Sequence, residues 1–90
     1  MPYRVRVTRI SENEIERLPG NVRQRIRRVI DGFTDEPRPP HAKELRDRPG
    51  RHRVAIEDWR IIYDVDDEDR LVVILTVRRK RGPDTYADIR

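Results

Sequence analysis

Three strand-like runs in the second half of the chain constrain its fold most. The three runs span approximately residues 51–57, 59–65 and 71–77. The pair Glu57-Asp58 separates the first two runs, and the acidic residues 66–69 separate the second from the third. Short polar connections between such runs are typical of hairpins, so the sequence predicts a three-stranded antiparallel meander. The last run is apolar almost throughout, which predicts burial on both faces and a central position.

The first half predicts one strand and two helices. Residues 3–9 alternate apolar and polar side chains, the period of a strand with one buried face. Ser11 and Glu14 have the spacing of a capping box, which predicts a short helix ending near Leu18. A second helix is expected from about Asn21, because apolar residues recur on one stripe, namely Val22, Ile26, Val29, Ile30 and Phe33. The proline-containing segment 35–50 is expected to be a connector with no more than a turn around residues 42–45.

These elements follow one another in the order β-α-α-β-β-β. The sequence therefore predicts an α+β fold, with a small antiparallel sheet and a helical hairpin packed on one of its faces. We expect residues 1–90 to form a single domain, since the chain has no internal repeat and no linker between two cores.

The composition is basic and rich in arginine. The chain has 21 basic and 17 acidic residues, a net charge of +4, and only two of the basic residues are lysines. The planar arginine fork matches phosphate, so the bias favours contact with RNA or DNA, although a genome rich in arginine codons explains it equally well. No residue is a cysteine, no signal peptide is evident, and no apolar run approaches the roughly 18 residues of a membrane span. A soluble cytoplasmic protein is expected, without a membrane partner.

Several enzyme classes are unsupported by the sequence. It contains no glycine-rich phosphate loop, no nucleophile elbow and no helix with paired histidines. Its two histidines, His41 and His52, lie eleven residues apart in unlike contexts, and His52 falls on the apolar face of its strand. We therefore expect no metal and no other cofactor, and we interpret His52 as a residue at the edge of the core.

Arginines on the predicted meander are the candidate site. Arg51, Arg53 and Ala55 share one face of their strand, and Arg60 is expected within cross-strand reach of Arg53 or Ala55. The basic run Arg78-Arg79-Lys80-Arg81 is expected at the same end of the sheet as Arg51, and Tyr86 adds a hydroxyl nearby. This pattern predicts a phosphate-binding site. Two alternatives are that Glu57, Asp58 or Asp64 pairs with Arg53 and Arg60, and that the basic run is a solvated or import-like patch.

The chain resembles the RelE/ParE superfamily of toxins from bacterial and archaeal toxin–antitoxin pairs, and the resemblance covers nearly the whole chain. It rests on the helical hairpin broken at Leu18-Pro19-Gly20, the connector leading to Lys43-Glu44-Leu45, residues 50–54, the segment Trp59–Val65, and Arg81-Gly82 with Tyr86. Members of the RelE branch cleave messenger RNA in the ribosomal A site without metal, and a cognate antitoxin holds them inactive.

The resemblance assigns roles by position. Arg53 matches a basic residue that contacts phosphate or transfers a proton, and Arg60 matches the arginine beside the scissile phosphate. Arg81, or Lys80, matches the second arginine of the transition state, and Tyr86 matches the tyrosine that handles the proton of the nucleophile. The remaining basic residues of the site, Arg51, Arg78, Arg79 and Lys80, are expected to bind RNA. Ala55 departs from the pattern, because some RelE proteins have a second lysine there.

The resulting hypothesis is a ribosome-dependent, metal-independent endoribonuclease that cleaves mRNA by attack of a 2′-hydroxyl on the adjacent phosphate. Its expected partners are a cognate antitoxin, mRNA and the ribosome. One alternative is a toxin of the ParE branch, which inhibits DNA gyrase and cleaves nothing. The other is a non-catalytic RNA-binding module.

Overall fold

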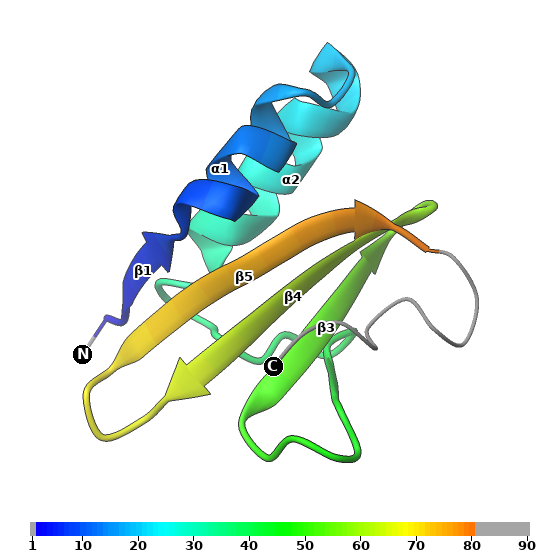
Figure 1. The fold of residues 1–90 in the computed structure, drawn as a ribbon. Coiled ribbons are helices and arrows are strands. Elements are labelled where there is room, and N and C mark those ends of the chain that lie inside the picture. Colours follow the sequence, from blue (N-terminus) through cyan, green and yellow to red (C-terminus); the bar gives the residue numbers. More distant parts are fainter. Residues whose placement is uncertain (1, 81–90) are drawn as a thin grey trace.

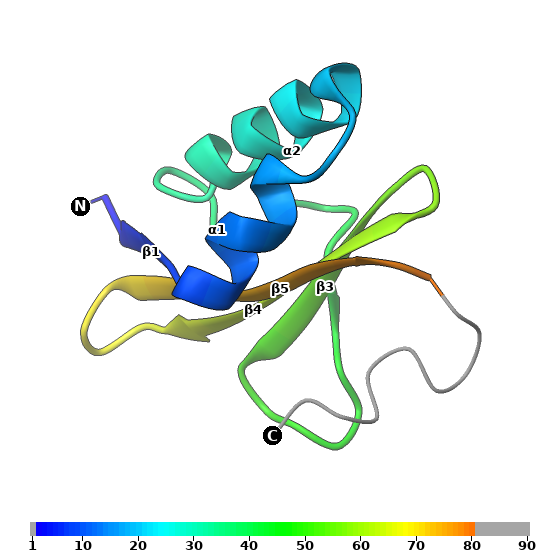
Figure 2. The ribbon, with the colours of Figure 1, turned by 45° about the horizontal axis from the view of Figure 1, so that its top comes forward.

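Two helices cover one face of a five-stranded sheet in the computed structural model, which describes residues 2–80 (Figure 1). The elements in chain order are β1 (Arg4–Val7), α1 (Arg9–Glu16), α2 (Gly20–Gly32), β2 (Lys43–Glu44), β3 (Arg51–Ile56), β4 (Trp59–Asp66) and β5 (Leu71–Arg79). Figure 2 shows both helices on the same side of the sheet, so neither of the described helices covers its other face. The predicted α+β class and the helical hairpin on one face are confirmed.

The strands are arranged in the order β1-β5-β4-β3-β2. The predicted meander is confirmed, since β3 pairs antiparallel with β4 around the two-residue turn and β4 pairs antiparallel with β5. β1, however, runs parallel to β5, from Arg4 opposite Leu71 to Val7 opposite Ile74, so the sheet is mixed. A further short strand, β2, pairs with β3 where only a turn was expected.

The strand at the centre of the sheet is β4, and β5 lies between it and β1. β5 alternates buried and half-buried residues over most of its length, so the expected burial on both faces is wrong for this strand. Four consecutive residues of β4, from Arg60 to Tyr63, are buried. A strand with a neighbour on each side can lie inside the sheet while one of its faces still reaches solvent.

The core lies between the helices and the sheet. The predicted stripe of α2 supplies Ile26 and Ile30, and α1 supplies Ile15. Tyr63 from β4 is fully buried beneath them, with its ring 4.3 Å from that of Phe33 and its hydroxyl donating to the carbonyl of Pro37 at 2.9 Å. Burial raises the pKa of Tyr63 to about 12. Neither described helix has the length and apolar character needed to cross a lipid bilayer.

Helix α1 begins earlier than the capping-box pattern predicts. Its N-cap is Thr8, which has an extended backbone and accepts a hydrogen bond from the Ser11 amide at 3.2 Å. Ser11 is buried in the first turn, where its hydroxyl donates to the carbonyl of Ile74 at 3.0 Å. The Glu14 carboxylate does not accept a hydrogen bond from the Ser11 backbone amide, as a capping box would require. It accepts hydrogen bonds from Thr76 and Val77 of β5 instead. The predicted N-cap at Ser11 is therefore wrong.

Helix α1 also covers the part of the β5 edge that β1 leaves unpaired. β1 ends opposite Ile74. Beyond that point the Thr8 hydroxyl donates to the carbonyl of Leu75 at 3.4 Å, and Glu14 accepts from the amide of Val77 at 3.0 Å. Side chains of α1 thus continue the hydrogen bonding of a strand edge that would otherwise be open to pairing.

Candidate nucleic-acid interface

Basic side chains from four strands meet on the sheet face opposite the helices. Cross-strand partners project from the same face, and the register pairs Lys43 with Arg53 and Arg60 with Arg78. Arg60 also lies opposite Ala55, two residues from Arg53 on the same face of β3, which confirms the predicted cross-strand reach. We call Lys43, Arg53, Arg60 and Arg78 the basic face.

Arg60 lies at the centre of the basic face and is nearly buried. It is 9% exposed, and its Nη1 donates to the carbonyls of Glu57 and Trp59, each at 2.9 Å. Its Nε is buried and has no hydrogen-bond partner among the described residues. Within residues 2–80 no carboxylate forms an ion pair with this guanidinium. A buried cation with neither a counterion nor a full set of acceptors favours binding of an anion.

Arg53 adds a second charge without a counterion. It is half-buried on β3, and it makes no hydrogen bond or ion pair in the part of the chain that the structure describes. A diagonal cross-strand separation of roughly 7–8 Å from Arg60 is close enough for mutual repulsion. An anion between the two side chains would relieve this repulsion. The alternative that Glu57, Asp58 or Asp64 neutralises these two arginines is not observed.

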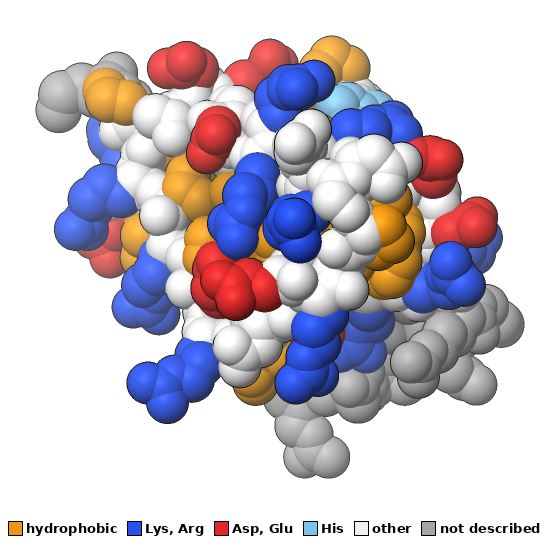
Figure 3. Space-filling model, turned by 90° about the horizontal axis from the view of Figure 1, so that it is seen from above, with side chains coloured by type: hydrophobic (Ala, Val, Ile, Leu, Met, Phe, Trp, Pro, Cys, Tyr) orange, Lys and Arg blue, Asp and Glu red, His pale blue; other side chains and the backbone are white. Residues whose placement is uncertain are grey.

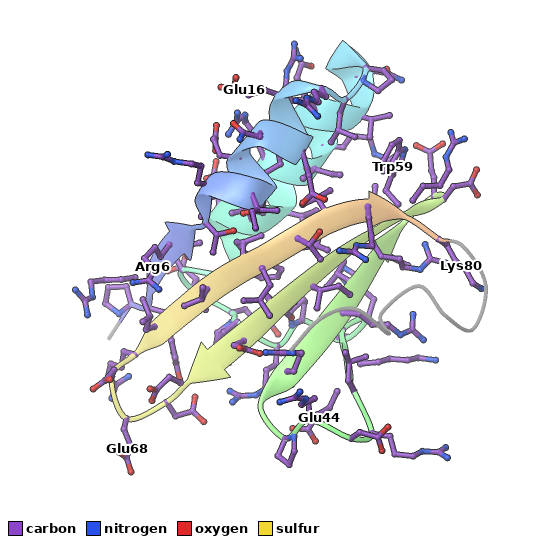
Figure 4. All side chains as sticks on the ribbon, viewed as in Figure 1. Arg6, Glu16, Glu44, Trp59, Glu68 and Lys80 are labelled. Carbon is purple, nitrogen blue, oxygen red and sulfur yellow. The ribbon has the colours of Figure 1, made fainter. Side chains whose placement is uncertain are left out.

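The basic run at the end of β5 divides between the two faces of the sheet. Arg78 lies on the basic face and its Nε donates to the hydroxyl of Thr76 at 3.3 Å. Arg79 lies on the other face, where its guanidinium is 5.3 Å from the ring centre of Trp59. Figure 4 shows Trp59 on the helix side of the sheet and Lys80 beyond the end of β5. Arg78 and Arg79 therefore cannot both face one ligand from the same side of the sheet, because successive strand residues point in opposite directions. Binding of RNA by Arg79 and Lys80 stays a prediction.

Arg51 does not join the basic run. β3 and β5 are both antiparallel to β4, so the end of β5 lies beside the end of β3, and Arg51 at the start of β3 is at the opposite end of the sheet. The Arg51 side chain donates to both carboxylate oxygens of Asp64, at 2.8 and 3.1 Å, and this carboxylate raises the pKa of Arg51. The predicted proximity is wrong, and RNA binding by Arg51 stays a prediction.

The end of the sheet near Arg51 is acidic. A cleft of about 510 Å³ is lined there by residues that include Asp64, Asp66 and Glu68. Figure 4 shows Glu68 and Lys80 at opposite ends of the sheet. Asp67, in the same turn, accepts hydrogen bonds from Arg38 and from the Tyr3 hydroxyl, and Arg38 is the main reason that its pKa is lowered. The charge distribution would thus place a polyanion on the basic face and away from this turn.

Basic residues on the helices lie among acidic ones (Figure 3). Arg25 forms an ion pair with Glu57, and Arg27 with Glu12 at 2.8 Å. Ion pairs of this kind are typical of an exposed, solvated helix surface.

The remaining sequence predictions have different outcomes. His52 is buried, lies 5.6 Å from the ring of Tyr63, and its Nδ1 is 3.1 Å from the carbonyl of Gly50, which confirms it as a core-edge residue. Lys43 was missed, because β2 has only two residues and no strand pattern. The predicted catalytic residues Arg81 and Tyr86 lie outside the residues that the structure describes.

Comparisons with known proteins agree on the kind of molecule. A family model described as "ParE toxin of type II toxin-antitoxin system, parDE" matches residues 5–82. A chain in the crystal structure of the toxin–antitoxin complex RelBE2 from Mycobacterium tuberculosis is 30% identical, with a TM-score of 0.75, and the match covers 89% of this chain and 100% of that one. A comparison with curated proteins gave no match.

Two further structures are similar in fold. A chain in the archaeal RelE–RelB complex from Pyrococcus horikoshii is 26% identical, with a TM-score of 0.80 and coverage of 92% of this chain and 99% of that one. A mutant of the E. coli toxin RelE in the free state is 21% identical, with a TM-score of 0.80 and coverage of 98% and 94%. At that identity, the E. coli structure supports the fold alone.

Proposed function

Since the chain belongs to the family of ParE toxins of type II toxin–antitoxin systems, within the RelE/ParE superfamily, we propose that it is an endoribonuclease that cleaves mRNA on the ribosome. The observation that carries this proposal is Arg60, a nearly buried guanidinium with no carboxylate partner among residues 2–80, beside Arg53 and Arg78. A guanidinium in this setting can stabilise the charge that develops on a phosphoryl oxygen during cleavage.

The basic face would bind the scissile phosphate. In the proposed reaction the ribose 2′-hydroxyl attacks the adjacent phosphorus, the bond to the 5′-oxygen breaks, and a 2′,3′-cyclic phosphate remains. Arg60 and Arg53 would stabilise the negative charge that develops on the phosphoryl oxygens. We propose that Arg81 adds to this stabilisation and that Tyr86 exchanges a proton with the nucleophile or the leaving oxygen. Arg78 and Lys80 would hold the flanking RNA backbone, and the reaction would need no metal.

The test is mRNA cleavage in a purified translation reaction, with the RNA ends mapped by primer extension. Arg60→Ala should slow cleavage by about 10²- to 10³-fold, the typical loss for one charge-stabilising donor. Arg27→Ala is the matched control, because this exposed arginine on α2 pairs with Glu12 away from the basic face, and its rate should equal that of the wild type. Tyr86→Phe tests the proton-transfer role. Products without a cyclic phosphate, or equal rates for Arg60→Ala and Arg27→Ala, would refute the proposed reaction.

A second function remains open because the matching family model is that of ParE. On this alternative the protein inhibits DNA gyrase, and the basic face binds a nucleic acid or an acidic protein without cutting it. A gyrase supercoiling assay separates the two functions. Inhibition of supercoiling by wild-type protein, together with intact mRNA in the translation assay, would establish the alternative. Steep salt-dependent RNA binding with neither activity would indicate an RNA-binding module.

We also propose that a cognate antitoxin binds this protein in the cytoplasm, where ribosomes are available. The support is that the similar chains from M. tuberculosis and P. horikoshii were crystallised in toxin–antitoxin complexes. Co-purification with the product of the neighbouring open reading frame should raise the melting temperature, because a ligand that binds only the folded state stabilises it. An unchanged melting temperature at saturating partner would contradict this assignment.

A further inference from the structure

A buried hydroxyl connects helix α1 to the basic face. Thr76 on β5 is 2% exposed, and its Oγ1 lies 2.7 and 2.9 Å from the two carboxylate oxygens of Glu14. The same Oγ1 lies 3.3 Å from the Nε of Arg78. Neither Glu14 nor Thr76 belongs to the predicted phosphate site. Thr76 lies two residues before Arg78 on β5, and Glu14 reaches β5 from helix α1.

The donors and acceptors allow a single direction for these hydrogen bonds. A carboxylate only accepts, and an arginine Nε–H only donates. The one hydroxyl proton of Thr76 is therefore donated to Glu14, and the oxygen lone pairs of Thr76 receive the Nε–H of Arg78. We call this chain of Glu14, Thr76 and Arg78 the relay.

Glu14, the first residue of the relay, is itself held in place by β5. The carboxylate of Glu14 also accepts from the backbone amide of Val77 at 3.0 Å, and Ser11, one turn earlier, bonds to the carbonyl of Ile74. Helix α1 is thus attached to β5 at two successive points. An arginine side chain normally loses much rotational freedom on binding, and one that is already held by its Nε loses less.

Arg78 needs such support because of its neighbour. It lies directly opposite Arg60 across β4 and β5, and two guanidinium groups at this spacing repel each other. Arg78 is half-buried and Arg60 is nearly buried, so Arg78 is the more exposed of the two. The bond to Thr76 at 3.3 Å restricts the Arg78 side chain at its Nε, on the strand position directly opposite Arg60.

We infer that Thr76 and Glu14 are positioning residues that hold Arg78 for contact with an RNA phosphate. This inference rests on the proposed function, since it assigns Arg78 to the RNA backbone. Neither Thr76 nor Glu14 contacts the RNA. Their effect on binding should therefore pass entirely through Arg78, which distinguishes positioning from a general contribution to stability.

The test measures the affinity of the full-length protein for a single-stranded RNA that carries 2′-O-methyl groups and cannot be cleaved. Thr76→Val, which keeps the shape and removes the hydroxyl, should weaken binding by about two- to tenfold, the effect of one hydrogen bond. Thr76→Ser should restore it. Thr34→Val is the matched control, because the Thr34 hydroxyl makes no hydrogen bond in the described part of the chain. In protein that already carries Arg78→Ala, Thr76→Val should have no further effect.

NMR of the arginine Nε–H groups provides a readout without RNA. The Arg78 signal should exchange slowly with water in the wild type and in Thr76→Ser, and rapidly in Thr76→Val. The inference fails if Thr76→Val binds RNA as tightly as the wild type, or weakens binding equally in the Arg78→Ala background. A wild type that binds no free RNA overturns the role of the relay in RNA binding, whereas the proposed function is decided by cleavage in the translation reaction. The NMR signal decides whether the hydrogen bond from Arg78 to Thr76 exists.

Discussion

Replacement of Tyr63 by Phe should change how stability depends on pH. The hydroxyl of Tyr63 donates to the carbonyl of Pro37 at 2.9 Å, and the side chain is fully buried. Near neutral pH, Tyr63→Phe should therefore lower the free energy of unfolding by about 1 kcal/mol, the net value of one buried hydrogen bond.

At alkaline pH this difference in stability should disappear. Burial raises the pKa of Tyr63 in the folded state to about 12 from an ordinary value of 10.0. A raised pKa gives stability that is fully present below pH 10 and is lost as the pH rises toward 12, because the unfolded chain ionises first. The full shift corresponds to about 3 kcal/mol, of which roughly 1.4 kcal/mol is lost by pH 11. The Tyr63→Phe variant has no hydroxyl to ionise and no such loss, so the two proteins should be equally stable near pH 11.

Urea unfolding followed by tryptophan fluorescence, at intervals from pH 7 to pH 11, measures this convergence. Tyr3→Phe is the control, since it makes the same chemical change at an exposed hydroxyl that bonds to Asp67 and leaves Tyr63 intact. This control should keep the alkaline loss that depends on Tyr63. A difference between the wild type and Tyr63→Phe that stays constant from pH 8 to pH 11 would refute the argument.

Two further changes test the capping of α1 and the acidic turn. Thr8→Ala removes the N-cap of α1 and should lower the free energy of unfolding by about 1 kcal/mol in urea titrations; no loss would mean that another group caps the helix. Asp67→Asn should make the free energy of unfolding depend less on pH in the acidic range. Arg38 lowers the pKa of Asp67, so its contribution is present above the ordinary pKa of 3.8 and is lost as the pH falls through the lowered value. The wild-type advantage should be constant above pH 5 and shrink toward pH 2, and a constant advantage over the whole range would contradict the assignment.

Most of the fold could be predicted from local sequence patterns, because burial of one face of a helix or strand requires apolar residues at a fixed spacing. The meander and the stripe on α2 follow from residues that alternate with the period of their own element. β2 has two exposed residues and exists only through its pairing with β3, so no local pattern indicates it. The capping-box pattern at Ser11 failed for a similar reason, since Glu14 finds its hydrogen-bond donors on a strand more than sixty residues away.

The part of the candidate site that lies on two consecutive strands joined by a short turn could be predicted from the sequence. The two-residue turn fixes the register of β3 and β4, which placed Arg60 near Arg53 correctly. The placement of Arg51 beside the basic run ignored the common direction of β3 and β5. The division of Arg78 from Arg79 followed from β5 continuing to Arg79, two residues beyond the predicted end of the strand. Direction and length of strands therefore decided which arginines share a face.

The parallel pairing of β1 with β5 has a consequence for synthesis. Residues 4–7 find their partners only at residues 71–74, so the first strand has no place in a sheet until most of the polypeptide has been translated. Arg60 likewise acquires Arg78 as a neighbour only after β5 emerges. The basic face is therefore incomplete until translation is almost finished, and a prematurely terminated product that lacks β5 should not bind a polyanion there.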